Sequence, residues 1–144
     1  SSTWKAFLTN EAKVIAGIDF FTVPTATFRV LYVFIVLTHD RRRVVHFNVT
    51  ENPTALWTAQ QIVEAFPWDS APKYLLRDND QIYSLIFSRR VKGLNIKETK
   101  TAYGSPWQNP NAERVIGSIR RDCLDHVVIF NEKHLHMILT AYFE

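Results

Sequence analysis

The sequence contains little cysteine and no long apolar run. Its single cysteine, Cys123, excludes an internal disulfide and a cysteine-rich zinc site, and we interpret it as a small apolar residue on a helix face. The longest apolar run extends only from Val30 to Leu37. This is far short of the roughly 20 residues that cross a bilayer, and it is typical of a buried strand. Because no signal-peptide pattern opens the chain either, we expect a cytoplasmic protein that makes no membrane contact.

Repeats, low-complexity tracts and interdomain linkers are also missing, so we predict a single domain over residues 1–144. Hydrophobic residues make up 47% of the chain, which is enough for a real core. The net charge of +3 is unevenly spread, because the stretch from Ser88 to Trp107 has five basic residues and only one acid, Glu98. Such a stretch suits a polyanion such as nucleic acid, although a solvated basic face is the alternative.

The pattern of apolar residues predicts a mixed α/β domain. After a short helix at Thr3–Asn10, the order is three strands in an antiparallel meander, then helix, strand, helix, strand and two helices. The strands are expected at Val14–Thr22, Phe28–Leu37, Val44–Thr50, Lys73–Arg77 and Leu94–Thr99. The helices are expected at Asn52–Phe66, Gln81–Val91, Asn109–Leu124 and Asn131–Phe143.

Several local features follow from the same pattern. We expect a turn at Thr22–Thr25, a hairpin connection at His39–Arg42 and a loop at Lys100–Asn109. In the third strand, alternation places Val45, Phe47 and Val49 on one face and Val44, His46 and Asn48 on the other. In the first long helix, Asn52 is the expected cap before Pro53, and the expected apolar stripe is Leu56, Ala59, Val63 and Phe66.

Three acidic residues are the candidate catalytic groups. Asp19 interrupts an apolar strand, Asp78 ends another, and Glu113 opens a helix. A carboxylate beside buried apolar side chains is costly unless something cationic compensates it. Taken singly, Asp78 can be a turn residue and Glu113 a favourable charge at a helix N-terminus. Converging, the three would bind a hard divalent cation such as Mg²⁺ and support phosphoryl-transfer chemistry.

The order of these acids resembles the catalytic core of the retroviral-integrase superfamily, which bacterial insertion-sequence transposases share with retroviral integrases. Thirty-four residues separate Asp78 from Glu113, close to the spacing usual in that family. Asp80 stands where the family usually has glycine. The resemblance covers essentially the whole chain, from about Trp4 to Phe143. The segments that carry it are Ile18–Thr22, Leu76–Asp80, Ser105–Arg114 and Gly117–Leu124.

The resemblance implies a ribonuclease H-like fold, with a five-stranded mixed sheet flanked by helices. It implies a single integrase or transposase catalytic core without the N-terminal and C-terminal DNA-binding domains of full-length members. Asp19, Asp78 and Glu113 would be the catalytic residues of a DDE motif and would hold two Mg²⁺ or Mn²⁺ ions. The implied reaction is DNA end cleavage followed by strand transfer. The partners would be the element's ends and target DNA, with a homodimer as the assembly and the bacterial nucleoid as the location.

Residues around the acids are candidates for DNA binding. Lys97 and Lys100 suit backbone phosphates, and Tyr103 and Trp107 suit base stacking, although a hydrophobic latch onto the domain is an equal alternative for the two rings. In the last-but-one helix, one apolar arc should pack on the sheet with Glu113 at its edge. That arc consists of Ala112, Val115, Ile116, Ile119 and Cys123. The remaining candidates are Gln108, Asn109, Arg114 and Arg121, with ordinary surface charge as the alternative for the two arginines.

Two other functions stay open on the sequence alone. One is a ribonuclease H-like nuclease that only hydrolyses, and the other is an inactive transposase remnant that binds DNA or dimerises. The presence of all three acids argues against the remnant. His134 and His136 lie two residues apart on a helix and so point to different faces, and we interpret them as surface residues rather than zinc ligands.

Overall fold

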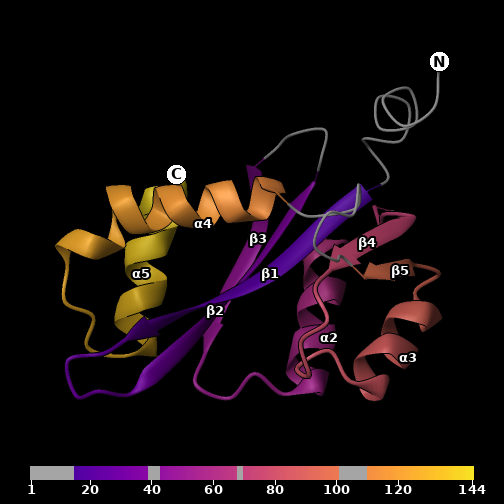
Figure 1. Cartoon of the computed structure of the whole chain (residues 1–144), viewed down its shortest axis with the longest axis horizontal. Coiled ribbons are helices and arrows are strands. Elements are labelled where there is room, and N and C mark those ends of the chain that lie inside the picture. The colour runs from indigo at the N-terminus through magenta and orange to yellow at the C-terminus, as the bar shows by residue number, and fades with distance from the viewer. Residues whose placement is uncertain (1–14, 39–42, 68–69, 101–109) are drawn as a thin grey trace.

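Five strands form one mixed sheet in the order β3-β2-β1-β4-β5, with helices on both faces (Figure 1). The computed structural model describes residues 15–38, 43–67, 70–100 and 110–144. The strands are β1 (Ile15–Pro24), β2 (Val30–Thr38), β3 (Arg43–Thr50), β4 (Tyr74–Arg77) and β5 (Lys97–Lys100). The helical elements are α2 (Ala55–Ala65), α3 (Leu85–Gly93), α4 (Pro110–Asp122), the short 3₁₀ turn η2 (Leu124–His126) and α5 (Glu132–Phe143). The predicted element order and fold class are confirmed.

The central strand β1 joins the two halves of the sheet. It pairs antiparallel with β2, which pairs antiparallel with β3, so the predicted meander is confirmed. On its other side β1 runs parallel to β4, and β4 runs parallel to β5. Asp19 lies opposite Ile35 in the middle of the β1–β2 ladder, and its position is therefore fixed by pairing on that side.

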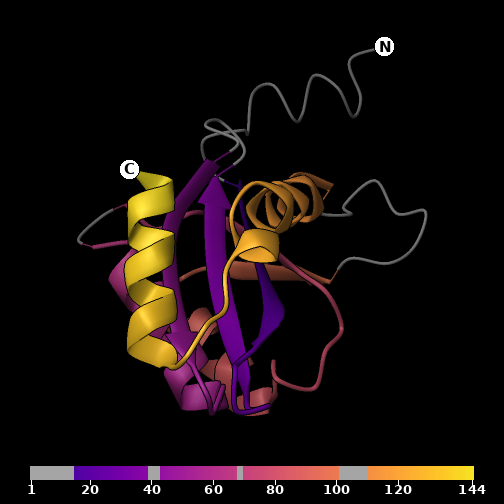
Figure 2. The same ribbon diagram turned by 90° about the vertical axis from the view of Figure 1, so that its left-hand side faces the viewer.

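Each face of the sheet has its own hydrophobic core, because successive side chains of a strand point to opposite faces. Ala16 and Ile18 of β1 pack with residues of α2 and α3. Phe21 and Val23 pack on the other face with residues of α4 and α5. Figure 1 shows α4 and α5 on one side of the strands and α2 and α3 on the other, and Figure 2 shows α5 running alongside the strands. By this alternation, Asp19 belongs to the face that α4 covers.

A β-bulge changes the predicted pattern of β3. Val36 pairs with His46, but the next residue of β2, Leu37, pairs with Val44. Val45 is therefore the extra residue, and it packs toward α2 and α3, whereas Val44 packs with Phe47 on the opposite face. The prediction that Val45 and Phe47 share a face was wrong, because a bulge inserts one residue into a strand and reverses the alternation beyond it.

The helix α2 begins later than predicted and buries a different face. Its cap is Thr54, whose hydroxyl accepts the Trp57 N–H at 3.1 Å, so Asn52 is not the cap. The predicted stripe was wrong in part, since Leu56 and Val63 are exposed while Gln61 is buried. Burial of this amide is possible because its side-chain oxygen accepts hydrogen bonds from β3. The donors are His46 (2.8 Å) and Asn48 (3.1 Å), with the histidine in its Nε2–H form.

The other boundaries differ by a few residues. β1 continues through Pro24, so the turn predicted at Thr22–Thr25 comes later, where the Phe28 N–H donates to the Thr25 carbonyl at 3.0 Å. The C-terminal helix starts one residue later than predicted, after Asn131, whose side chain caps it by accepting the His134 N–H. The expected helix at residues 3–10, hairpin at 39–42 and most of the loop at 100–109 fall outside the described residues. No helix of the described ranges is both long enough and apolar enough to cross a membrane.

Candidate active site

Asp19 is held half-buried in the middle of β1. Its Oδ1 accepts the backbone N–H of Phe20 at 2.8 Å, which fixes the orientation of the carboxyl group. Burial raises the pKa of Asp19 from 3.8 to about 6, against the lowering effect of this hydrogen bond. The negative charges of Asp78, Glu113 and Asp80 raise the pKa further, so all three carboxylates lie within electrostatic reach of Asp19.

Asp78 lies on an exposed turn directly after β4. Its Oδ1 accepts the Asp80 N–H at 3.1 Å, and Asp80 in turn accepts the Ile82 N–H at 2.9 Å. These two hydrogen bonds from aspartate side chains to the backbone hold the chain between β4 and α3 in a tight turn. The turn places the carboxylates of both aspartates near Asp19, which lies on the neighbouring strand β1.

Glu113 is carried by the first turn of α4 and is exposed. The helix is fixed on the sheet by fully buried Ala112 and Ile119. Val115, Ile116 and Cys123 pack against the same core, which confirms the predicted apolar arc. Arg120 adds a cation–π contact, with its guanidinium 5.2 Å from the ring centre of Phe21 on β1. Glu113 therefore lies at the rim of the α4–sheet interface.

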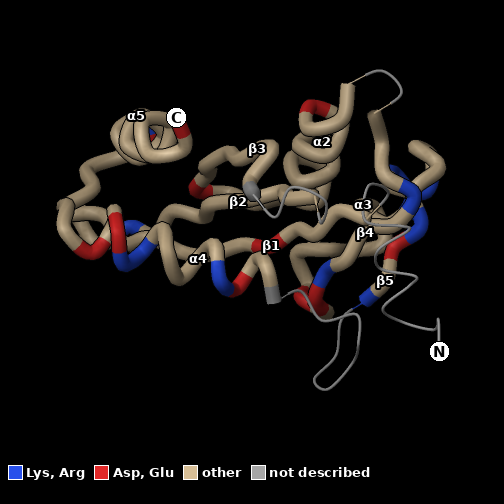
Figure 3. The backbone as a smooth tube through the Cα atoms, turned by 90° about the horizontal axis from the view of Figure 1, so that it is seen from above, with Lys and Arg blue, Asp and Glu red and all other residues tan. Residues whose placement is uncertain are grey.

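Asp19, Asp78 and Glu113 lie in one region of the molecule but do not form a compact cluster. In Figure 3, acidic positions of β1, of the segment after β4 and of the start of α4 lie near one another. Among the residues that the structure describes, however, no three carboxylate, imidazole or thiolate groups are close enough to hold one ion. Charge–charge influence reaches well beyond a coordination bond, so the two observations agree. Carboxylates are the oxygen donors that a hard divalent cation prefers, and such an ion would relieve the repulsion between these acids.

A buried arginine supports the second acid. Arg77 is only 3% exposed at the end of β4. Its Nε donates to Glu98 of β5, and its Nη1 donates to the Asp78 carbonyl at 2.7 Å. The guanidinium also lies 5.1 Å from the ring centre of Tyr83. Sequence reasoning missed these three supporting residues, although a charged residue ending the apolar run of β4 and a lone acid within a basic stretch were visible signals.

Tyr83 packs against Arg77 and against two phenylalanine rings of the core. Its ring contacts Phe20 and Phe87 at centroid distances of 6.0 and 5.1 Å. Within the described ranges its buried hydroxyl has no hydrogen-bond partner. Burial raises the pKa of Tyr83 well above its ordinary value, and the charges of Asp19 and Asp78 add to this effect. The phenol therefore stays protonated at all physiological pH values.

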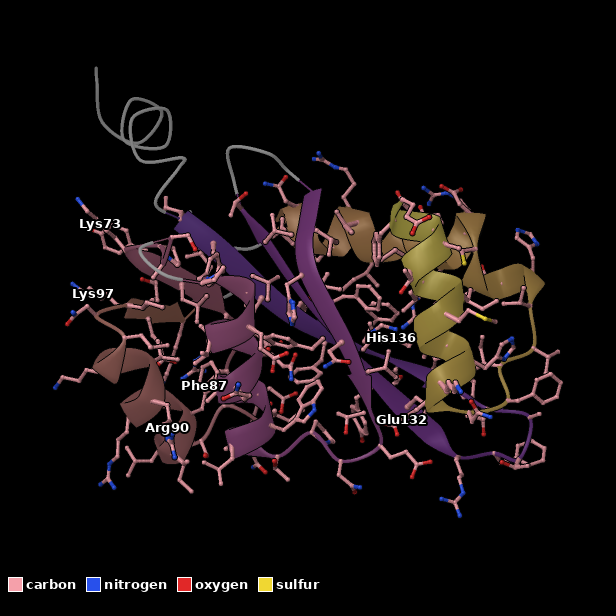
Figure 4. All side chains as sticks on the ribbon, turned by 180° about the vertical axis from the view of Figure 1, so that it is seen from behind. Lys73, Phe87, Arg90, Lys97, Glu132 and His136 are labelled. Carbon is pink, nitrogen blue, oxygen red and sulfur yellow. The ribbon has the colours of Figure 1, made fainter. Side chains whose placement is uncertain are left out.

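The predicted DNA-binding residues fall into three groups. Lys97 and Lys100 are exposed at the two ends of β5. Figure 4 shows Lys97 beside Lys73 at one end of the molecule, with Arg90 further along on α3. Among the described residues none of these four cations forms an ion pair. The remaining predicted residues are Arg114 and Arg121, both exposed on α4, and Tyr103, Trp107, Gln108 and Asn109, which lie outside the described residues.

Arg121 and the two histidines make local contacts. Arg121 Nε lies 4.0 Å from Asp122 of the same helix, which is a weak surface ion pair. His134 accepts the Phe130 N–H through Nδ1 at 3.1 Å. His136 stacks on Phe47 with ring centres 4.9 Å apart.

Comparison with solved structures identifies the architecture. The catalytic domain of Mos1 mariner transposase superposes with a TM-score of 0.74 at 14% identity, covering 99% of this chain and 78% of that one. The HTLV-2 integrase catalytic core domain in complex with magnesium gives 0.63 at 16% identity, covering 78% and 70%. The chain has the fold of the integrase and transposase catalytic cores.

A chain of a larger assembly has a similar fold over part of its length. A chain of the simian T-cell lymphotropic virus intasome, in complex with PP2A regulatory subunit B56 gamma, matches with a TM-score of 0.69 at 16% identity. The match covers 88% of this chain and 47% of that one, so this chain spans about half the length of the matched chain. No protein-family model and no curated protein sequence matches the chain.

Proposed function

We propose that the chain is the catalytic core of a divalent-metal-dependent DNA strand-transfer enzyme. One observation carries the proposal: the charges of Asp78 and Glu113 raise the pKa of Asp19, so both carboxylates lie within electrostatic reach of Asp19. The three acids come from β1, from the end of β4 and from the start of α4. These elements come from distant parts of the sequence, and ordinary turn and helix-dipole roles give no reason for them to meet. The integrase-like fold supports the same conclusion, and related cores have been determined with magnesium or manganese.

In this proposal the three carboxylates hold Mg²⁺ or Mn²⁺, which when bound activates the attacking oxygen and stabilises the leaving 3′ oxygen. Asp19 has the most fixed position, because β1 pairs with β2 at this residue and the Phe20 N–H orients its carboxyl group. Asp78 and Glu113 lie on exposed segments, so they can adjust toward an ion. The proton that Asp19 retains up to a pH of about 6 must leave before it can serve as a ligand.

DNA would approach along the basic side of β5. Lys97 and Lys100 would bind backbone phosphates, which positions a duplex without reading its sequence. Arg114, one residue beyond Glu113 on α4, would bind phosphate on the other side of the acids. We also propose that the core acts as an oligomer, since the HTLV-2 core has been determined in both dimeric and trimeric forms.

The deciding experiment follows the fate of DNA ends. The protein is incubated with Mn²⁺, a supercoiled plasmid and random-sequence duplexes with labelled 3′-hydroxyl ends. Joined products support strand transfer, whereas nicked plasmid alone supports a hydrolytic nuclease. Binding without any reaction supports an inactive remnant. We expect Asp78→Asn to remove the reaction and Asp125→Asn, which changes an exposed acid of η2, to retain it. An active Asp78→Asn variant would refute the three-acid site.

The proposed phosphate contacts predict a change in salt dependence. Each lysine bound to a duplex phosphate contributes about 0.9 to the slope of log K against log salt. Lys97→Gln should therefore weaken duplex binding and reduce this slope by about 1. The matched control is Lys133→Gln, an exposed lysine of α5, which should leave the slope unchanged. Fluorescence anisotropy over a range of KCl concentrations measures both, and equal slopes in the two variants would place the DNA elsewhere.

A further inference from the structure

The buried Arg77 connects three elements around the second acid. It ends β4, it reaches across to Glu98 of the edge strand β5, and it holds the carbonyl of Asp78, the first residue of the following turn. Glu98 is itself largely buried, with 15% of its side chain exposed. Burying two charges is costly, and apolar residues of similar volume usually hold a fold together equally well. Stability alone therefore does not explain why Arg77 and Glu98 are buried together.

The geometry of the hydrogen bonds of Arg77 explains why this pair is buried. A guanidinium is a planar fork, so Nε can serve Glu98 while Nη1 serves the Asp78 carbonyl. Fixing that carbonyl fixes the peptide plane after Asp78, and with it the direction in which the Asp78 side chain leaves the backbone. The Asp78 side chain itself has a described hydrogen bond with the Asp80 N–H, so the Arg77 bond adds a constraint through the backbone. The face of Tyr83 covers the guanidinium and limits its movement.

The charges of Arg77 and Glu98 are also consistent with a role in orienting Asp78. A free cation beside Asp19, Asp78 and Glu113 would compete with a metal ion for the carboxylates. Glu98 neutralises Arg77, and the described hydrogen bond from the arginine to Asp78 goes to the backbone oxygen of that residue. The pair thus orients an acid while leaving its carboxylate oxygens available to a cation. Supporting groups of this kind tune metal affinity by orienting the ligands.

We infer that Arg77, held by Glu98, is a positioning residue that orients Asp78 for binding Mg²⁺ or Mn²⁺. This inference rests on the proposed function, because it assumes that Asp78 is a ligand. It assigns a specific task to the edge strand β5, which contributes none of the three candidate acids. The affinity of the site for a divalent cation then depends on a residue that never touches the ion.

The test measures Mn²⁺ binding by titration calorimetry in the absence of DNA. The double variant Arg77→Met/Glu98→Leu replaces the buried pair with apolar residues, and thermal unfolding checks that it folds. We expect its Mn²⁺ affinity to fall about 10- to 100-fold. The matched control Arg29→Met/Glu51→Leu removes the exposed pair 3.4 Å apart at the other end of the sheet, and its affinity should equal that of the wild type. Arg77→Lys keeps the charge but loses the fork, so it should also weaken binding.

The outcomes separate the inference from the function on which it rests. If the double variant and Arg77→Lys bind Mn²⁺ as the wild type does while Asp78→Asn loses binding, the positioning role is wrong and the metal site stands. If the wild type binds no Mn²⁺, the proposed metal site is wrong and the inference falls with it. If the double variant does not fold, Arg77→Lys alone decides, because it retains the ion pair with Glu98.

Discussion

Replacing Asp19 with Asn is expected to stabilise the metal-free protein at neutral pH and at the same time to reduce DNA cleavage and joining strongly. The folded-state pKa of Asp19, about 6, lies above its ordinary value of 3.8. A carboxyl group whose pKa is raised by folding makes its full contribution to the free energy of unfolding below pH 3.8. That contribution is lost as the pH rises through 6. At pH 7 the ionised group costs about 1 to 3 kcal/mol, and Asn avoids this cost. The Asn side-chain oxygen can still accept the Phe20 N–H.

Urea unfolding at several pH values, with a chelator present, measures this effect. The variant should exceed the wild type in stability at pH 7, and the advantage should disappear near pH 4. Adding Mn²⁺ should raise the stability of the wild type only, because binding to the native state alone stabilises it. DNA joining should fall by about 10³-fold, since metal-centred charge stabilisation is worth several kcal/mol. A variant less stable than the wild type at pH 7 would mean that a cation already neutralises Asp19.

Replacing Glu98 with Leu is expected to destabilise the protein by about 3 to 5 kcal/mol. The substitution leaves Arg77 with a buried and uncompensated charge, because the arginine is only 3% exposed. Its remaining polar contact in the described structure is the Asp78 carbonyl. The double variant Arg77→Met/Glu98→Leu should lose far less, since removing both charges removes the cost of burying them.

Urea denaturation of the single and double variants at pH 7 tests this prediction. The difference between them isolates the cost of the unpaired charge from the loss of packing. A Glu98→Leu variant within about 1 kcal/mol of the wild type would show that water reaches Arg77, as it does in exposed ion pairs. A double variant as unstable as the single one would show that the hydrogen bond to Asp78, rather than the charge, holds the turn.

The element order and the candidate acids could be predicted from the sequence because they depend on local patterns. Apolar runs mark buried strands at any depth in the sheet, and an acid within such a run, such as Asp19, is visible without a structure. The last helix was also placed within a residue of its observed start, because its pattern is local, although its Asn131 cap was not predicted. The meeting of Asp19, Asp78 and Glu113 was predicted only through resemblance to a family.

The features that the sequence analysis missed depend on contacts between distant residues. The Arg77–Glu98 pair requires β4 and β5 to lie side by side, and the spacing of the chain does not show this. Gln61 is buried because His46 and Asn48 lie opposite it, so an apolar stripe could not predict the face of α2. The bulge at Val45 follows from pairing with β2, and an isolated strand carries no sign of it.

The position of β5 also has a consequence for solubility. This strand ends the described sheet, and a terminal strand offers backbone donors and acceptors to any strand from another molecule. β5 is only four residues long and has a lysine at each end, Lys97 and Lys100. Short charged edges of this kind discourage aggregation, because a second copy would bring like charges together. Neutralising both lysines in a DNA-binding experiment would therefore remove a protection against self-association, and light scattering should accompany every such titration.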